Sequence, residues 1–420
     1  MRTETSDAPE IVVPPSVIEA VLSQERVDEP PHSFYKYPAR FSPVFAREAI
    51  KAFTSKGETV IDPFCGGGTS LVEAISLGRR AAGFDISTLA AFVARVKTTP
   101  ISVHDKRRIS KWAEMIDHVE TPNTVNQDLT EEEAHYLRNL PGGARAFFEA
   151  MRGHIERLGT ERERMFARLA LLSVGQWALD CKTEVPNWGH LQHQFREQVN
   201  TVLSEHFQYI TDVASTNSLP RCRLSQMRRV INKSCEESEH DGRIPASWLP
   251  AKLVLTSPPY PGVHVVYHRW QINGRKETPA PFWLANCRDG AGESFYCLGR
   301  RGEPELKTYF NRLGKAFTSV RGLIGPDSLV VQLVAFSAPE WQLPAYLRKM
   351  EEAGFAEMMP QCDEDYLFEG RIWREVPGRK WYANQKGKTA ASKEVLLLHK
   401  PRSADHLNSA LRSRIVSGMK

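Results

Sequence analysis

The sequence of 420 residues has no apolar run long enough to span a membrane, and its first residues lack the pattern of a secretory signal peptide. We therefore expect a cytoplasmic protein with no membrane partner. The 7 cysteines are an odd number and include no C-x-x-C pair. Reduced thiols are expected rather than a disulfide framework.

Two further signatures are missing. No lysine follows the three successive glycines at 66–68, which excludes a kinase-type P-loop. The pairs His190/His193 and His264/His268 have helical spacing but no accompanying cysteine or acid motif, so we expect no metal site. The net charge of +5 is mildly basic, which permits a nucleic-acid partner without requiring one.

A glycine-rich stretch follows the first apolar run of the chain. Residues 59–61 read as a strand, and residues 62–69 (Asp-Pro-Phe-Cys-Gly-Gly-Gly-Thr) follow at once. Successive glycines let a backbone pass close to a ligand. A capping box of Ser70 and Glu73 predicts a helix next, and a second strand then ends at Asp85, where a ribose-binding carboxylate is expected. The alternative is a tight turn packed on the sheet.

A second stretch, Ser257-Pro258-Pro259-Tyr260, follows the apolar run 252–256. Two prolines cannot continue a sheet ladder, so the strand ends there in a stiff turn with a hydroxyl and an aromatic ring. Ligands bind at the carboxyl ends of strands in open α/β sheets, and such a turn suits a flat, amino-bearing ring. The alternative is a plain Pro-Pro turn with a tyrosine packed on it.

Together the two stretches resemble the DNA amino-methyltransferases that use S-adenosyl-L-methionine. Residues 62–69 resemble their cofactor loop, motif I. Residues 257–260 resemble their catalytic motif IV, with the serine that is typical of cytosine-N4 enzymes. Residues 32–41 (His-Ser-Phe-Tyr-Lys-Tyr-Pro-Ala-Arg-Phe) resemble motif X, which packs around the methionine end of the cofactor.

The resemblance implies an α/β fold with a doubly wound, Rossmann-like sheet of seven strands, an antiparallel closing strand and a helical insert. The expected parts are a flexible N-terminal segment with a short helix (1–30), a cofactor-binding half (31–97), a helical insert over the carboxyl edge of the sheet for target recognition (98–225), a catalytic half (226–402) and a basic tail (403–420).

The resemblance also implies the roles of individual residues. The catalytic residues are Ser257, Pro258, Pro259 and Tyr260. The Ser257 hydroxyl and the Pro258 carbonyl would accept the hydrogens of the target amine, and Tyr260 would stack on the base, so Tyr260→Phe should keep most activity. Asp85 would bind the ribose. The expected cofactor-binding residues are Tyr35, Pro38, Asp62, Pro63, Phe64, Cys65, Gly66, Gly67, Gly68, Thr69, Asp85, Ile86 and Asn232.

Arginine and aromatic residues are interleaved in the segment 261–305, directly after the catalytic turn. That composition suits backbone phosphates and unstacked bases. The candidate DNA-binding residues are Arg269, Trp270, Arg300 and Arg301. A solvated surface loop with some buried aromatics is the alternative.

These features predict a site-specific DNA methyltransferase that acts on the N4 amine of cytosine, flipped out of double-stranded DNA, within a restriction-modification or related defence system. Cys65, in the glycine loop, is read as a small loop filler and not as the nucleophile of a cytosine-C5 enzyme. Three alternatives stay open: an adenine-N6 DNA methyltransferase, a tRNA guanine-N2 methyltransferase and a non-catalytic DNA-binding module.

Overall fold

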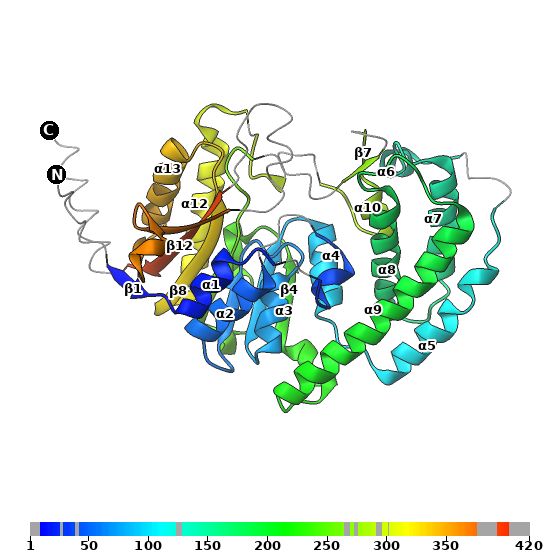
Figure 1. Ribbon diagram of the computed structural model, residues 1–420, viewed down its shortest axis with the longest axis horizontal. Coiled ribbons are helices and arrows are strands. Elements are labelled where there is room, and N and C mark those ends of the chain that lie inside the picture. The colour runs from blue at the N-terminus through cyan, green and yellow to red at the C-terminus, as the bar shows by residue number, and fades with distance from the viewer. Residues whose placement is uncertain are drawn as a thin grey trace.

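The computed structural model describes residues 9–25, 28–37, 42–122, 128–263, 269–272, 276–290, 296–300, 302–375 and 393–402 (Figure 1). A twisted sheet with helices on both faces forms one side of the molecule, and a group of long helices forms the other (Figure 1). No helix in the described ranges is long and apolar enough to cross a membrane.

The sheet is largely parallel. Its strands are, in spatial order, β1 (Glu10–Val12), β9 (Phe355–Gln361), β12 (Lys393–Pro401), β8 (Ile324–Ala335), β5 (Ala251–Thr256), β2 (Thr59–Asp62), β3 (Arg80–Asp85) and β4 (Arg228–Asn232). Strand β12 runs antiparallel to both of its neighbours. Two short strands, β10 (Leu367–Phe368) and β11 (Arg371–Glu375), pair antiparallel beside β12. The predicted doubly wound α/β sheet with an antiparallel closing strand is confirmed; the three strands beyond the expected seven are β1, β10 and β11.

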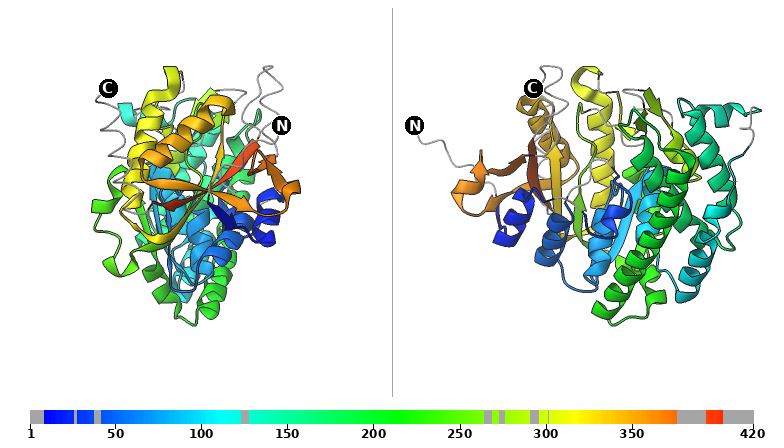
Figure 2. Two further views of the ribbon diagram at one scale, coloured as in Figure 1. Left: turned by 90° about the vertical axis from the view of Figure 1, so that its left-hand side faces the viewer. Right: turned by 45° about the vertical axis from the view of Figure 1, so that its right-hand side comes forward.

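Adjacent residues of each central strand face opposite cores, because side chains alternate along a strand. In β2, Val60 packs among α1 (Pro15–Leu22), α2 (Pro43–Phe53) and α3 (Thr69–Ser76). Ile61 packs on the other face, among α12 (Lys307–Arg321) and α13 (Pro339–Glu352). Figure 2 shows these two helix layers on either side of the strands. Burial on both faces explains why the strands read as continuous apolar runs.

The strand order reverses between β2 and β5. From β2 the chain continues through α3 to β3 on one side, and from β5 it continues through α12 to β8 on the other. In open α/β sheets the connections diverge at such a point and leave a crevice at the carboxyl ends of the strands, where ligands bind. The glycine-rich stretch follows β2 and Ser257-Pro258-Pro259-Tyr260 follows β5, so both lie at this crevice.

The N-terminal segment differs from the expected flexible lead-in. Strand β1 pairs in parallel with β9, with Glu10 opposite Met359. Helix α1 buries Val17, Ile18 and Val21 against α2 and β11. The apolar face predicted for a short helix at 16–24 is therefore buried in the main core, which is why the segment is part of the fold.

The helices after β3 share one core. They are α4 (Thr88–Lys97), α5 (Val103–Ala113), α6 (Glu131–Tyr136), α7 (Gly142–Ile155), α8 (Glu161–Leu179) and α9 (Trp188–Thr216). Phe147, Phe166 and Phe195 pack in this core together with Val96 of α4. Helix α8 contacts α4, and the group lies at one side of the sheet (Figure 1). Its position over the carboxyl edge of the sheet and its role in target recognition stay predictions.

The remaining elements are short. Strands β6 (Trp270–Ile272) and β7 (Lys276–Thr278) form a hairpin, and α10 (Ala280–Leu284) follows. The 3₁₀ helices are η1 (His32–Phe34), η2 (Ile116–His118), η3 (Arg221–Met227), η4 (Cys235–His240), η5 (Ala246–Trp248), η6 (Pro304–Leu306) and η7 (Glu364–Tyr366).

Candidate active site

The glycine loop between β2 and α3 needs all three of its glycines. Gly66 and Gly68 have φ of 48° and 82°, in the left-handed region that other residues adopt only at a cost. Gly67 lies against Tyr37, and a Cβ at Gly67 would come within 2.9 Å of the Tyr37 Cβ. The loop therefore keeps this path, close against Tyr37, only with glycine at these positions.

Asp62 holds this loop against β5. Its carboxylate accepts hydrogen bonds from the Ser70 hydroxyl, from Thr256 Oγ1 at 2.7 Å and from the Phe64 amide at 3.1 Å. The side chain is buried, and burial raises the pKa of Asp62 to about 6. The structure thus gives this predicted cofactor residue a supporting role between the two strands of the crevice.

Asp85, at the end of β3, closes the loop from the other side. Its Oδ2 accepts the Gly66 amide at 2.9 Å, and its Oδ1 accepts the Ser87 amide at 2.8 Å. Burial raises the pKa of Asp85 to about 6, although both backbone hydrogen bonds oppose the rise. Each carboxylate oxygen keeps a second lone pair, so Asp85 can still accept hydrogen bonds from ligand hydroxyls.

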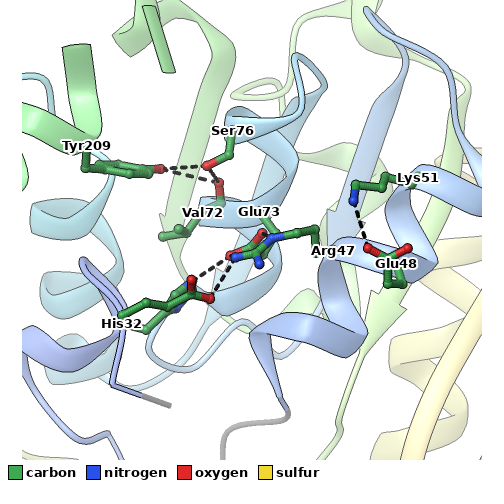
Figure 3. Close-up of polar contacts among 9 residues, drawn as sticks. His32, Arg47, Glu48, Lys51, Val72, Glu73, Ser76 and Tyr209 are labelled. Atoms are coloured by element: carbon green, nitrogen blue, oxygen red, sulfur yellow. Dashed lines mark hydrogen bonds and ion pairs between the residues drawn. The ribbon is translucent and has the colours of Figure 1, made fainter. Parts of the chain in front are cut away.

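The predicted capping box of Ser70 and Glu73 is wrong. Helix α3 begins at Thr69 after Gly68, which supplies no side-chain cap. Glu73 instead accepts His32 Nε2 at 2.8 Å and Arg47 Nε at 2.8 Å, as Figure 3 shows. Burial alone would raise the pKa of Glu73, but its bonds to His32 and Arg47 lower it. This buried cluster ties the segment after residue 31 to α3.

That segment delivers Tyr37, not Tyr35, to the crevice. Tyr35 is buried, and its hydroxyl accepts Trp270 Nε1 at 3.3 Å. Tyr37 lies over Gly66 and Gly67 and faces the cavity. Pro38, the other predicted residue here, lies outside the described residues.

A small cavity of about 80 Å³, partly open to solvent, lies in the crevice. The predicted residues that line it are Pro63, Phe64, Gly66, Asp85, Ile86, Ser257 and Pro259. The predicted residues that do not line it are Tyr35, Asp62, Cys65, Gly67, Gly68, Thr69, Asn232, Pro258 and Tyr260. Of these, Asn232 donates from Nδ2 to the Asp85 carbonyl at 2.8 Å, which braces β4 against β3.

Sequence reasoning missed six lining residues: Tyr37, Ser87, Lys233, Cys235, Tyr296 and Leu298. Ser234, which also lines the cavity, is the alternative that the sequence offers to Asn232 for a contact with the adenine ring. Ser87 follows the end of β3, and residues 233–235 follow β4, so their position at strand ends was an available signal. Tyr296 and Leu298 come from an irregular segment without periodicity, where no such signal exists.

The tyrosine of the Ser257–Tyr260 turn is not a platform at the cavity. Tyr260 is only 5% exposed and packs in the core beside α12. Its hydroxyl lies 2.9 Å from Ser257 Oγ and donates to Glu394 Oε1 at 2.6 Å. The stacking role expected for Tyr260 is therefore corrected: strand β12 supplies a buried acceptor that holds the ring inside the fold.

Two of the predicted DNA-binding residues are structural. Trp270 is 2% exposed and packs against Gly175 of α8. Arg269 has a side chain only 16% exposed and pairs with Asp289 at 3.1 Å. Arg300 is exposed, as a phosphate contact requires. Arg301 lies outside the described residues.

A family model described as DNA methylase (N6_N4_Mtase) matches residues 15–93, which include the glycine loop and Asp85. Two curated proteins are similar to this chain over 113 residues each. Type II methyltransferase M.MjaII of Methanocaldococcus jannaschii is 26% identical, over 27% of this chain and 20% of that protein. Type II methyltransferase M.MvaI of Kocuria varians is 33% identical, over 26% of this chain and 24% of that protein. The matches thus span about a quarter or less of each relative.

Among solved structures, the rRNA methyltransferase aviRa of Streptomyces viridochromogenes is similar over 89% of this chain and 94% of its own, with a TM-score of 0.31 and 10% identity. At this TM-score the likeness carries no argument about function.

Proposed function

We propose that the chain is a DNA methyltransferase that uses S-adenosyl-L-methionine. One observation carries the proposal: the glycine loop after β2 and the Ser-Pro-Pro turn after β5 border a single cavity at the point where the strand order reverses. The family match over residues 15–93 and the two type II methyltransferases support the same activity.

The cofactor would lie on the side of the cavity nearest β2 and β3. Gly67 packs against Tyr37, and Gly66, which borders the cavity, has no side chain to project into it. Asp85 would accept the ribose hydroxyls, and Ile86 and Phe64 offer apolar contact. When bound, S-adenosyl-L-methionine supplies the methyl group and a positive charge that is lost on transfer, and an apolar wall favours that loss.

The amine would lie at the β5 side of the cavity. The lone pair of an exocyclic ring amine is delocalised, so the nitrogen is a poor nucleophile until it becomes pyramidal. The Ser257 hydroxyl and the Pro258 carbonyl would each accept one amine hydrogen and aim the lone pair at the methyl group. This is catalysis by positioning and by electrostatic stabilisation. A serine hydroxyl is too weak a base to remove the proton, so the proton leaves late, to water.

The target is proposed to be the N4 amine of cytosine, because serine heads the turn. The base must leave the duplex to reach the cavity, which costs a few kcal/mol. The proposed partners are therefore double-stranded DNA with a flipped base and the proteins of a restriction-modification or related defence system. Adenine-N6 transfer is the second candidate, since the matching family model covers both N6 and N4 enzymes by name.

The test is incubation of the full chain with radiolabelled cofactor and either double-stranded DNA or tRNA, followed by mass spectrometry of the nucleosides. We expect N4-methylcytosine from DNA only. Methyl on adenine N6 would replace the cytosine assignment, and label in tRNA alone would overturn the DNA substrate.

The Ser257→Ala variant should transfer methyl more slowly and bind the cofactor as tightly as the unaltered chain. Ser204→Ala is the matched control, because Ser204 is exposed on α9 and its hydroxyl donates only to the carbonyls of its own helix in the described structure. A fully active Ser257→Ala enzyme would remove the catalytic role of the serine.

A further inference from the structure

A line of hydrogen bonds leads from the turn after β5 into the interior. Ser257 Oγ lies 2.9 Å from the Tyr260 hydroxyl, which donates to Glu394 Oε1 at 2.6 Å. The other oxygen, Glu394 Oε2, accepts from Arg374 Nε at 2.7 Å and pairs with Arg374 Nη2 at 2.6 Å. Glu394 is on β12 and Arg374 is its direct partner on β11.

The direction of each hydrogen bond in this line follows from counting the hydrogens that each group can donate. An arginine is always charged, so the Glu394 carboxylate beside it is ionised and can only accept. A tyrosine hydroxyl has one hydrogen, and Tyr260 gives it to Glu394. The Tyr260 oxygen can then only accept from Ser257, so the Ser257 hydrogen points inward. The lone pairs of Ser257 Oγ are left for the cavity.

We propose that Glu394 is a positioning residue that, through Tyr260, sets Ser257 as a hydrogen-bond acceptor toward the target amine. The inference rests on the proposed function and deepens it. Tyr260 then acts from the interior side of the site, and β12 contributes to the catalytic arrangement through Glu394.

Stability alone gives little reason for this pair. Glu394 is 3% exposed and lies beside Val395, Leu396 and Leu397, which are all buried. Well-packed apolar residues in place of a buried ion pair are often equally or more stable. A carboxylate in this strand is costly unless it has partners, and its partners among the described residues include an arginine and the tyrosine next to the reacting centre.

Glu394→Gln tests the proposal because it keeps the shape and changes the donors. A glutamine whose oxygen accepts from Arg374 would donate its amide hydrogen to the Tyr260 oxygen. The Tyr260 hydrogen would then occupy a lone pair of Ser257, and Ser257 would donate into the cavity. We expect kcat for methyl transfer to DNA to fall about tenfold or more, with the cofactor Kd by calorimetry unchanged.

The matched control is Glu357→Gln. Glu357 on β9 accepts two hydrogen bonds from Arg371 of β11, at 2.7 and 2.8 Å, in the same sheet. The same chemical change there should leave kcat unaltered. Melting temperatures of both variants show whether each is folded.

Two further variants separate positioning from a structural role. Tyr260→Phe keeps the ring and removes the relay, so its kcat should fall as much as that of Glu394→Gln; the sequence alone predicted that most activity would remain. When Ser257 is already alanine, Glu394→Gln should change kcat by less than about twofold, because both act through the same hydroxyl.

Wild-type kcat in Glu394→Gln, or losses that add to those of Ser257→Ala, would overturn the relay and leave the proposed function intact. Absence of methyl transfer by the unaltered protein would overturn the proposed function, and the role of the relay with it.

Discussion

The glycine loop after β2 and the Ser257–Tyr260 turn after β5 border the same cavity, but different parts of the chain determine their geometry. The loop is shaped by its own glycines and by Asp62 and Asp85, which end the two strands on either side of it. The turn is held by residues far along the chain: Glu394 accepts from Tyr260, and Tyr309 donates to the Pro259 carbonyl at 2.7 Å. Local geometry is encoded near the residues that use it, whereas the chemistry of the turn depends on β12 and α12.

Among these variants, Gly68→Ala should have the largest effect, because it changes the glycine loop, whose geometry is determined locally. The left-handed φ of 82° and a Cβ only 2.8 Å from that of Ala94 leave no room for alanine. We expect a loss of about 2–4 kcal/mol in the free energy of unfolding, measured by urea titration. Gly153→Ala in α7 meets no atom within 4 Å and is the control, which should be unchanged or slightly more stable. Equal effects of the two would contradict the role of the left-handed loop.

Asp85→Ala should weaken cofactor binding by roughly 2–3 kcal/mol, because a charged hydrogen-bond partner is lost. Part of that loss comes from the Gly66 amide, which then lacks its acceptor. Calorimetric titration with S-adenosyl-L-methionine measures the change. Unchanged affinity would show that Asp85 only supports the loop.

The raised pKa of Asp85, about 6, predicts a pH dependence of binding. The ionised carboxylate is the better acceptor, so affinity should fall roughly tenfold as pH drops from about 7 to about 5. Protein stability should change in the opposite sense. A carboxyl pKa raised from 3.8 to about 6 stabilises the fold below pH 3.8, and this contribution is lost as pH rises to about 6. Asp85→Asn should flatten the binding profile, and a profile that stays steep would assign the titration to another group.

The smallest effect is expected in the segment after the turn, where two arginines differ in burial. Arg300→Ala should weaken binding to all DNA sequences alike and reduce the slope of log affinity against log salt by about 1. Arg269→Ala should leave the slope unchanged and lower the melting temperature, because the buried Asp289 loses one of its partners. Gel-shift titrations at several salt concentrations measure the slope, and an unchanged slope for Arg300→Ala would make that residue an ordinary surface side chain.

Local features of the sequence sufficed to predict the sheet, the crevice and the half of the site built from β2, the glycine loop and Asp85. Apolar runs, glycines and strand ends are local features, because the backbone and side-chain preferences that produce them depend on only a few neighbouring residues. The order of the strands then follows from parallel pairing and from the two helical connections that diverge at β2 and β5.

The remaining features of the site depend on contacts between distant parts of the chain. Tyr260 and Trp270 have the residue types of stacking platforms, but Glu394 and Gly175 place them inside the core. Tyr37 faces the cavity, whereas Tyr35 is buried and its hydroxyl accepts a hydrogen bond from Trp270 Nε1. Each outcome depends on a partner far away in the chain, and burial or exposure of an aromatic or charged side chain is set by such partners and not by its own neighbours in sequence.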